Sequence, residues 1–252
     1  MSAIVRLLGI DLDGTLLNNK QEISIVDEKA IRKTMEQGVI VVPITGLPKS
    51  DIPKKIQRLF ENSYWITSNG AVTTVAKCKT DIVTVNLNYE VVIQILDYLF
   101  KMKEVQIEVF MNGMIYVESN HMKEVKNKYK DTSLKIAIKE VNNLKEFVKK
   151  YKNEIVGISV TTSTEDIRIK IQKDLLKYKN IRVTLNKKKG LEIHSIHTSK
   201  RSAIVKLGKI IGIDKSEILV CTNSNIAYAI DKFILGERAA DSCCDEYQCT
   251  SI

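Results

Sequence analysis

Two aspartates near the start of the chain, Asp11 and Asp13, have the type and spacing of a catalytic pair. They follow the apolar run of residues 4–8 and precede Gly14 and Thr15, so a buried strand is expected to end there in a sharp turn. The strand period of two sends both side chains to the same side. One aspartate can attack phosphorus and form an aspartyl-phosphate, while the other donates and then accepts a proton.

Other structures also use an Asp-x-Asp-Gly sequence, chiefly solvated turns and acidic calcium loops. An EF-hand loop needs Asp-x-Asp-x-Asp-Gly and a later glutamate, and that spacing is absent after Asp11. In open α/β sheets, ligands bind beyond the carboxyl ends of the strands. The position of the pair at a strand end therefore favours a catalytic site.

The composition is that of an ordinary globular protein. The chain has 252 residues, of which 44% are hydrophobic and 27% charged, enough for one large domain or two modest ones with a sizeable core. Residues 1–6 lack the basic-then-apolar order of a signal peptide, and no apolar run approaches the ~18 residues of a membrane span. These features predict a cytoplasmic protein without a membrane partner.

The formal charge of +9 does not by itself predict a nucleic-acid interface. Such an interface needs basic residues gathered in a stripe with interleaved aromatics, whereas the lysines here are dispersed and only Lys187–Lys189 form a tight cluster. Compositional bias towards Lys, Ile and Asn is one explanation of the charge, and attraction of a phosphorylated small molecule is a simpler explanation for part of it, so no nucleic-acid partner is expected.

The five cysteines are an odd number and do not suggest a disulfide framework. Cys243, Cys244 and Cys249 crowd the C-terminus, but no second ligand pair at zinc-like spacing accompanies them. Free thiols are therefore expected.

The first part of the chain alternates apolar runs with helical patterns. Residues 39–44 and 64–67 read as buried strands. Helices are expected over residues 28–37, capped by Ser24 or Asp27, and over about residues 50–61, with a hairpin at 72–85. This order predicts an α/β protein with a parallel, doubly wound sheet.

From residue 86 to residue 186 the pattern changes to an α+β insert. Asn112-Gly113 lies between two alternating runs, a strong hairpin signal. Further strands are expected at residues 155–161 and 181–185, with an amphipathic helix at 166–177.

The stretch from Gly9 to Leu17, Gly-Ile-Asp-Leu-Asp-Gly-Thr-Leu-Leu, resembles the haloacid dehalogenase (HAD) superfamily, in particular its Cof-type, sugar-phosphatase-like branch. The resemblance implies a Rossmann-like parallel-sheet core of residues 1–85 and 187–252, with an α+β cap domain of residues 86–186 inserted into it. It also implies a nucleophile at Asp11, a general acid/base at Asp13 and a bound Mg²⁺.

Three further motifs extend the resemblance. Thr45-Gly46 stands on the family's second motif, which implies phosphate ligands, although Leu47 replaces the arginine that usually follows. Asn69 lies in Ser-Asn-Gly-Ala, which matches a family loop; the asparagine either makes a tight left-handed turn or lies beside the active site. Lys200 falls on the third motif, where its ammonium can hold phosphoryl oxygens.

Two histidines near the third motif, His194 and His197, belong to a residue type that also serves as metal ligand or general base. They stand where the family has ordinary loop residues, so we expect exposed or packing histidines.

The fourth motif departs from the family. Thr222 and Ile226 stand where it has two aspartates, and Asn225 keeps the asparagine. Asp11 and the Asp13 backbone carbonyl, with Thr222 and Asn225 as further candidate ligands, would then bind Mg²⁺ weakly. The last residues, polar and cysteine-rich, replace the expected strand and helix, as in a diverged or truncated pseudoenzyme or after a frameshift.

The sequence as a whole predicts a magnesium-dependent, HAD-type phosphatase for small phosphorylated metabolites. The alternative is a catalytically impaired HAD-like module that binds phosphate or regulates. The sequence leaves the choice between monomer and homodimer open.

Overall fold

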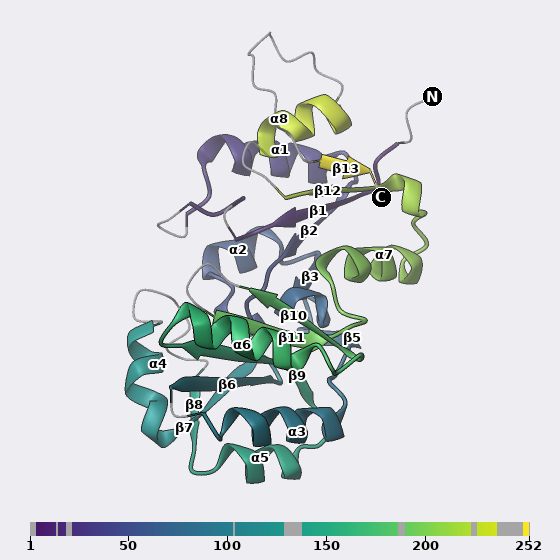
Figure 1. Cartoon of the computed structure of the whole chain (residues 1–252). Helices are drawn as coiled ribbons and strands as arrows, with labels where there is room; N and C mark the ends of the chain where they lie inside the picture. The colour runs from purple at the N-terminus through teal and green to yellow at the C-terminus, as the bar shows by residue number, and fades with distance from the viewer. Residues whose placement is uncertain are drawn as a thin grey trace. The chain divides into compact units, whose positions relative to one another are not determined.

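The computed structural model describes residues 4–13, 15–18, 22–102, 104–128, 138–185, 190–222, 226–235 and 249–251. Lys187–Lys189, Asn225, Cys243 and Cys244 lie outside these ranges. The chain forms two compact units (Figure 1). The first holds Met1–Gly46, Pro53–Ile82 and Lys200–Ile252, and the second holds Leu47–Ile52 and Val83–Ser199.

A mixed, mainly parallel sheet forms the centre of the first unit. Within the described residues it has seven strands in the order β13-β12-β1-β2-β3-β4-β5. The pairs β12–β1, β1–β2 and β2–β3 are parallel, and β12–β13 and β3–β4 are antiparallel. The strands are β1 (Leu7–Asp11), β2 (Ile40–Ile44), β3 (Tyr64–Thr67), β4 (Val72–Val75), β5 (Thr80–Thr84), β12 (Ile218–Cys221) and β13 (Cys249–Ser251). This is the α/β, Rossmann-like core that the sequence predicts.

The helices of the first unit are α1 (Ile25–Glu36), α2 (Lys54–Leu59), α7 (Lys200–Ile210) and α8 (Ile226–Ile230), and a π-helical turn covers Asp231–Leu235. Ser24 caps α1, because its side chain accepts a hydrogen bond from the backbone N–H of Asp27. No helix among the described residues is long and apolar enough to cross a membrane.

The helix expected over residues 50–61 is shorter than predicted. A 3₁₀ turn covers Lys49–Asp51, and α2 begins only at Lys54. Pro53 explains the break, because a proline disfavours helical backbone in the residue before it; Ile52 has an extended ψ of 122°.

Helix α7 packs closely against the middle of the sheet. Ile204 and Leu207 of α7 are fully buried against Leu7, Ile44 and other strand side chains. A Cβ atom placed on Gly9 would lie 2.4 Å from Ile204 Cδ1, so glycine allows this close approach. The packing fixes the start of α7, where Lys200 lies.

The second unit has an α+β arrangement, a sheet with helices packed against it. Within the described residues its strands lie in the order β10-β11-β9-β6-β7-β8. They are β6 (Val105–Met111), β7 (Met114–Glu118), β8 (Ile138–Val141), β9 (Ile155–Thr162), β10 (Ile181–Leu185) and β11 (Gly190–Ser195). The helices are α3 (Tyr89–Leu99), α4 (Met122–Lys128), α5 (Leu144–Lys150) and α6 (Glu165–Leu175). Buried side chains of α3, α5 and α6 share one core with those of β6, β9 and β11.

The β6–β7 hairpin turns at Asn112 and Gly113, which have φ values of 51° and 71°. These positive angles are the ones that the Asn-Gly hairpin signal predicts.

The boundaries of the two units differ from those that the family resemblance implied. The expected cap spans residues 86–186, whereas the second unit includes Val83–Ser199 and also Leu47–Ile52. Residues 190–195, expected in the core, form β11, which pairs with β9 and β10. The chain therefore enters the first unit again at Lys200.

Candidate active site

The two aspartates lie at the carboxyl end of β1. Asp11 is the last residue of the strand, and Asp13 makes an isolated parallel bridge with Leu17 just beyond it. The backbone N–H of Asp13 donates to Asp11 Oδ1 at 3.3 Å. Since β1 is central in a parallel arrangement, its carboxyl end adjoins the loops that follow β2 and β12.

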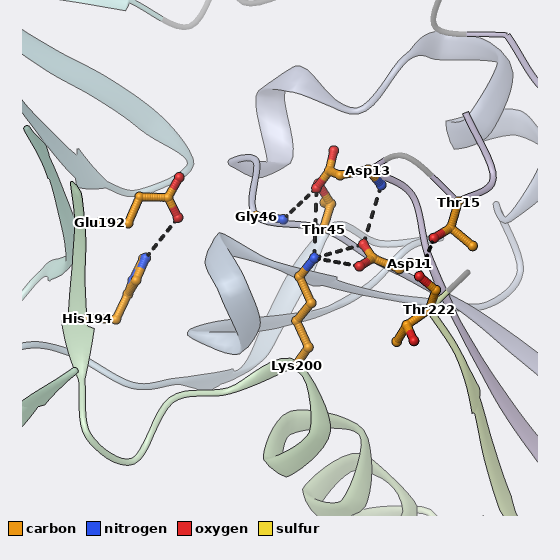
Figure 2. A network of polar contacts seen from close by, with 9 residues as sticks. All are labelled: Asp11, Asp13, Thr15, Thr45, Gly46, Glu192, His194, Lys200 and Thr222. Atoms are coloured by element: carbon orange, nitrogen blue, oxygen red, sulfur yellow. Dashed lines mark hydrogen bonds and ion pairs between the residues drawn. The ribbon is translucent and has the colours of Figure 1, made fainter. Parts of the chain in front are cut away.

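Lys200 reaches this pair from the first turn of α7, 189 residues away in the sequence. Its Nζ donates to both oxygens of Asp11, at 2.8 and 2.9 Å, and lies 4.0 Å from Asp13 Oδ2 (Figure 2). The ammonium is thus placed between two carboxylates, where an anionic substrate would also meet it.

The end of β2 supplies two hydrogen-bond donors. Thr45 Oγ1 and the backbone N–H of Gly46 both donate to Asp13 Oδ2, at 2.8 and 3.0 Å (Figure 2). Thr45 is held in place because its own N–H donates to the carbonyl of Ile66 in β3, at 2.9 Å. Two converging donors that bind one carboxylate oxygen have the arrangement that a phosphoryl oxygen requires.

Asn69 is both a turn residue and a neighbour of this loop. Its backbone is left-handed, with φ 56° and ψ 26°, and its N–H donates to the carbonyl of Thr45 at 3.1 Å. A Cβ atom on Gly46 would lie 3.0 Å from Asn69 Oδ1, so the side chain lies against Gly46. Asn69 therefore makes the left-handed turn and also lies beside Gly46 of the candidate site, so the two alternatives left open by the sequence are compatible.

Burial sets the electrostatics of the candidate nucleophile. The Asp11 side chain is 15% exposed, against 40% for Asp13. Burial raises the pKa of Asp11 above its ordinary value, the Lys200 ammonium opposes that rise, and the Asp13 carboxylate adds to it. Lys200 therefore favours the ionised carboxylate, the form that can attack phosphorus.

The end of β12 lacks acidic side chains at the two fourth-motif positions described. Thr222 follows β12 and is exposed, and its carbonyl accepts a hydrogen bond from Thr15 Oγ1 at 2.7 Å (Figure 2). Ile226 begins α8 and is fully buried. Thr15 was expected only as a turn residue. Its hydroxyl joins the loop after β1 to the loop after β12, a role that the sequence pattern does not predict.

The oxygen donors that could hold a metal ion here are few. In the described ranges, no group of three or more histidine, cysteine, aspartate or glutamate residues could hold one. The Asp11 carboxylate and the main chain at Asp13 still offer hard oxygens, which fit an Mg²⁺ ion that takes its remaining ligands from water and a phosphate. Asn225 lies outside the described residues.

His194 belongs to the second unit and packs there. It is 2% exposed, with Nδ1 3.1 Å from the carbonyl oxygen of Val156 and Nε2 3.9 Å from Glu192 Oε2 (Figure 2). His197 is exposed. Both agree with the expectation of packing or exposed histidines.

Comparison with known proteins decides the family. A model of haloacid dehalogenase-like hydrolases matches residues 8–222 of the chain. The chain belongs to this HAD-like hydrolase family. The match begins within β1, before Asp11, and ends at Thr222, so it includes the described site residues from Asp11 to Lys200. The predicted Cof-type branch is confirmed.

Individual HAD relatives are distant but similar along most of their length. The 5-amino-6-(5-phospho-D-ribitylamino)uracil phosphatase YcsE of Bacillus subtilis (strain 168) is 23% identical over 221 residues, 87% of this chain and 77% of YcsE. A HAD-like hydrolase structure from B. subtilis has a TM-score of 0.75 at 22% identity, covering 91% of this chain and 87% of that one. The subclass IIB sugar phosphatase BT4131 has a TM-score of 0.73 at 19% identity, covering 91% and 85%. The structures establish the HAD fold, and the relatives support a phosphatase in the broad sense.

Proposed function

We propose that this protein hydrolyses small phosphorylated metabolites through an aspartyl-phosphate on Asp11. The observation that carries the proposal is the placement of Lys200 Nζ within 2.9 Å of both Asp11 oxygens, beside the two donors that converge on Asp13. The names of the relatives YcsE and BT4131 refer to a phosphoribityl compound and to sugars. A phosphorylated sugar or polyol is accordingly the substrate class that we propose.

In the first step, a carboxylate oxygen of Asp11 attacks phosphorus and forms a new P–O bond. The bond from phosphorus to the leaving oxygen breaks, and protonated Asp13 gives that oxygen its proton. Lys200 offsets the negative charge of Asp11 and the phosphoryl group as they approach each other.

In the second step, water attacks the phosphorus of the aspartyl-phosphate. Asp13, now ionised, accepts a proton from this water, the bond to Asp11 breaks and inorganic phosphate leaves. Both carboxyl groups thereby return to their initial states.

The donors of β2 must change partners during this cycle. Thr45 Oγ1 and the Gly46 N–H bind Asp13 Oδ2 in this structure. A substrate phosphoryl oxygen that takes these donors frees the Asp13 carboxyl group for proton transfer. Asn69 supports the loop from the other side, through its hydrogen bond to the Thr45 carbonyl.

Magnesium is proposed as a weakly bound cofactor. The Asp11 carboxylate and the Asp13 carbonyl would hold it, with a lesser contribution from the exposed side chain of Thr222. When bound, the ion supplies positive charge that offsets the phosphate and Asp11. A cytoplasmic location stays a prediction from the sequence.

The first test is hydrolysis of p-nitrophenyl phosphate by the purified protein across a magnesium titration, with Asp11→Asn as the blank. We expect turnover that requires magnesium and vanishes in Asp11→Asn. Absence of turnover above the blank at every magnesium concentration would overturn the phosphatase proposal.

The alternative, an impaired phosphate-binding or regulatory module, rests on Thr222 and the buried Ile226 in the fourth motif. It predicts no turnover together with saturable binding of inorganic phosphate, measured by calorimetry and weakened in Lys200→Ala. Turnover in the first test would exclude this alternative.

A further inference from the structure

A hollow of about 660 Å³ lies on the first unit, away from the residues of the candidate active site. Lys54 and Arg58 of α2 line one side, and Lys77 and Lys79 at the tip of the β4–β5 hairpin line another. Trp65 of β3 forms part of its wall. None of the four polar residues Asp11, Asp13, Thr45 and Lys200 lines it.

The rim of this hollow is strongly basic. All four cationic side chains are exposed, and Glu61 is the acidic residue that lines the hollow with them. Among the described residues, Lys54, Arg58 and Lys77 form no ion pair, whereas the adjacent Lys55 pairs with Glu28 at 3.1 Å. Uncompensated positive charge around a concave surface raises the local concentration of anions.

Trp65 is the aromatic residue in the wall of the hollow. It is 3% exposed, and its Nε1 is itself buried, so this nitrogen does not meet a ligand in the hollow. The feature that favours an anion is therefore the cationic rim around a concave surface.

We propose that the hollow binds a small polyanion with two adjacent phosphate groups, at a site separate from Asp11 and Lys200. Lys54 and Arg58 lie one helical turn apart on α2, and Lys77 and Lys79 lie two residues apart between β4 and β5, so the rim offers one cationic group for each phosphate. Arginine binds phosphate through two parallel N–H donors. The volume lies within the range of small-molecule sites.

The chain contains a single tryptophan, so the fluorescence of Trp65 reports on this hollow directly. The experiment titrates the full-length protein with sodium pyrophosphate at constant ionic strength. It is repeated with a Lys200→Gln protein, which removes an anion ligand of the active site. We expect a saturable change in fluorescence with the same midpoint in both proteins.

The variants that test the site are two pairs, Arg58→Gln with Lys77→Gln and Lys54→Gln with Lys79→Gln. Each should weaken pyrophosphate binding about tenfold or more, because charge-assisted hydrogen bonds are lost. Lys55→Gln is the matched control, an exposed lysine on the same helix, and should leave the midpoint unchanged. All the substituted side chains are exposed, and unchanged melting temperatures check that the variants fold.

Three outcomes would overturn the proposal: no saturable response, a response that sodium chloride reproduces, or a midpoint unaffected by both variant pairs. Orthophosphate binding as tightly as pyrophosphate would overturn the assignment of two phosphates. Because the titration requires no turnover, it is independent of the proposed phosphatase activity.

Discussion

The two aspartates of the site are chemically alike but differ in environment. Asp11 is the more buried and pairs with Lys200 through both oxygens. Asp13 is the more exposed and binds the donors at the end of β2. The difference suits a nucleophile that stays ionised and a partner that exchanges protons.

The raised pKa of Asp11 makes stability depend on pH in a definite direction. Between the ordinary value of 3.8 and the raised pKa, the folded protein binds more protons than the unfolded chain. Stability from this group therefore falls as the pH rises through that window and is then constant. We expect Asp11→Asn to gain stability relative to wild type over the same window, measured by urea unfolding at a series of pH values with chelator present.

Lys200→Gln provides the check on this interpretation. It removes the ammonium that lowers the pKa of Asp11. The pH range over which stability falls should therefore extend to higher pH. If the free energy of unfolding depends on pH in the same way in wild type and Asp11→Asn, the raised pKa of Asp11 is contradicted.

The role of Asp13 predicts a dependence on the leaving group. Asp13→Asn should lower kcat/KM by about 10²–10⁴-fold for an alkyl phosphate, whose leaving oxygen needs a proton. The loss should be smaller for p-nitrophenyl phosphate, whose leaving group departs as an anion. Steady-state kinetics on both substrates measures this; equal losses would argue against a general acid at Asp13.

The fourth motif predicts a gain of function. Thr222→Asp should lower the magnesium concentration for half-maximal activity by about 10–100-fold, because it adds a carboxylate ligand. Thr222→Asn is the neutral control and should change it little. Ile226→Asp is expected to destabilise the fold by about 2 kcal/mol or more, since residue 226 is fully buried in α8.

At the scale of elements, the strands of the core were predictable because each is a short apolar run followed by turn residues. β1, β2 and β3 were recognised in this way, and with them the positions of Asp11 and Thr45. The start of α2 at Lys54 differs from the predicted residue 50, because Pro53 keeps Ile52 out of helical backbone.

Contacts between loops that are far apart in the sequence could not be predicted from local sequence patterns. The hydrogen bond from Thr15 to Thr222 joins residues 207 apart, and no local pattern marks it. The contact of Lys200 with Asp11 was expected only through a family resemblance. Residue types predicted the chemistry, but packing alone determines which side chains meet.

The turn after β3 gives a prediction that separates backbone from side chain. Asn69→Ala should cost about 1 kcal/mol, because alanine tolerates the left-handed backbone less well, while Asn69→Gly should cost less. Thermal denaturation measures both. If glycine destabilises as much as alanine, the side chain rather than the turn contributes the stability.

At the scale of the whole molecule, the two units differ in how their segments are joined. Residues 83–199 are continuous and contain the buried residues of the core shared by α3, α5, α6, β6, β9 and β11. We expect a fragment of residues 83–199 to fold alone, with a cooperative urea transition and a native-like circular dichroism spectrum. A fragment without a cooperative transition would show that its core depends on the rest of the chain.

Strand β1, an interior strand of the first unit, pairs with strands from both ends of the sequence. β1 pairs with β2 on one side and with β12, residues 218–221, on the other. During synthesis on the ribosome, one edge of β1 therefore has no partner until some two hundred further residues have emerged. Unpaired strand edges attract other chains. The nascent protein consequently depends on late arrival of its last core segments, which also bring Lys200, to protect the edge and complete the site together.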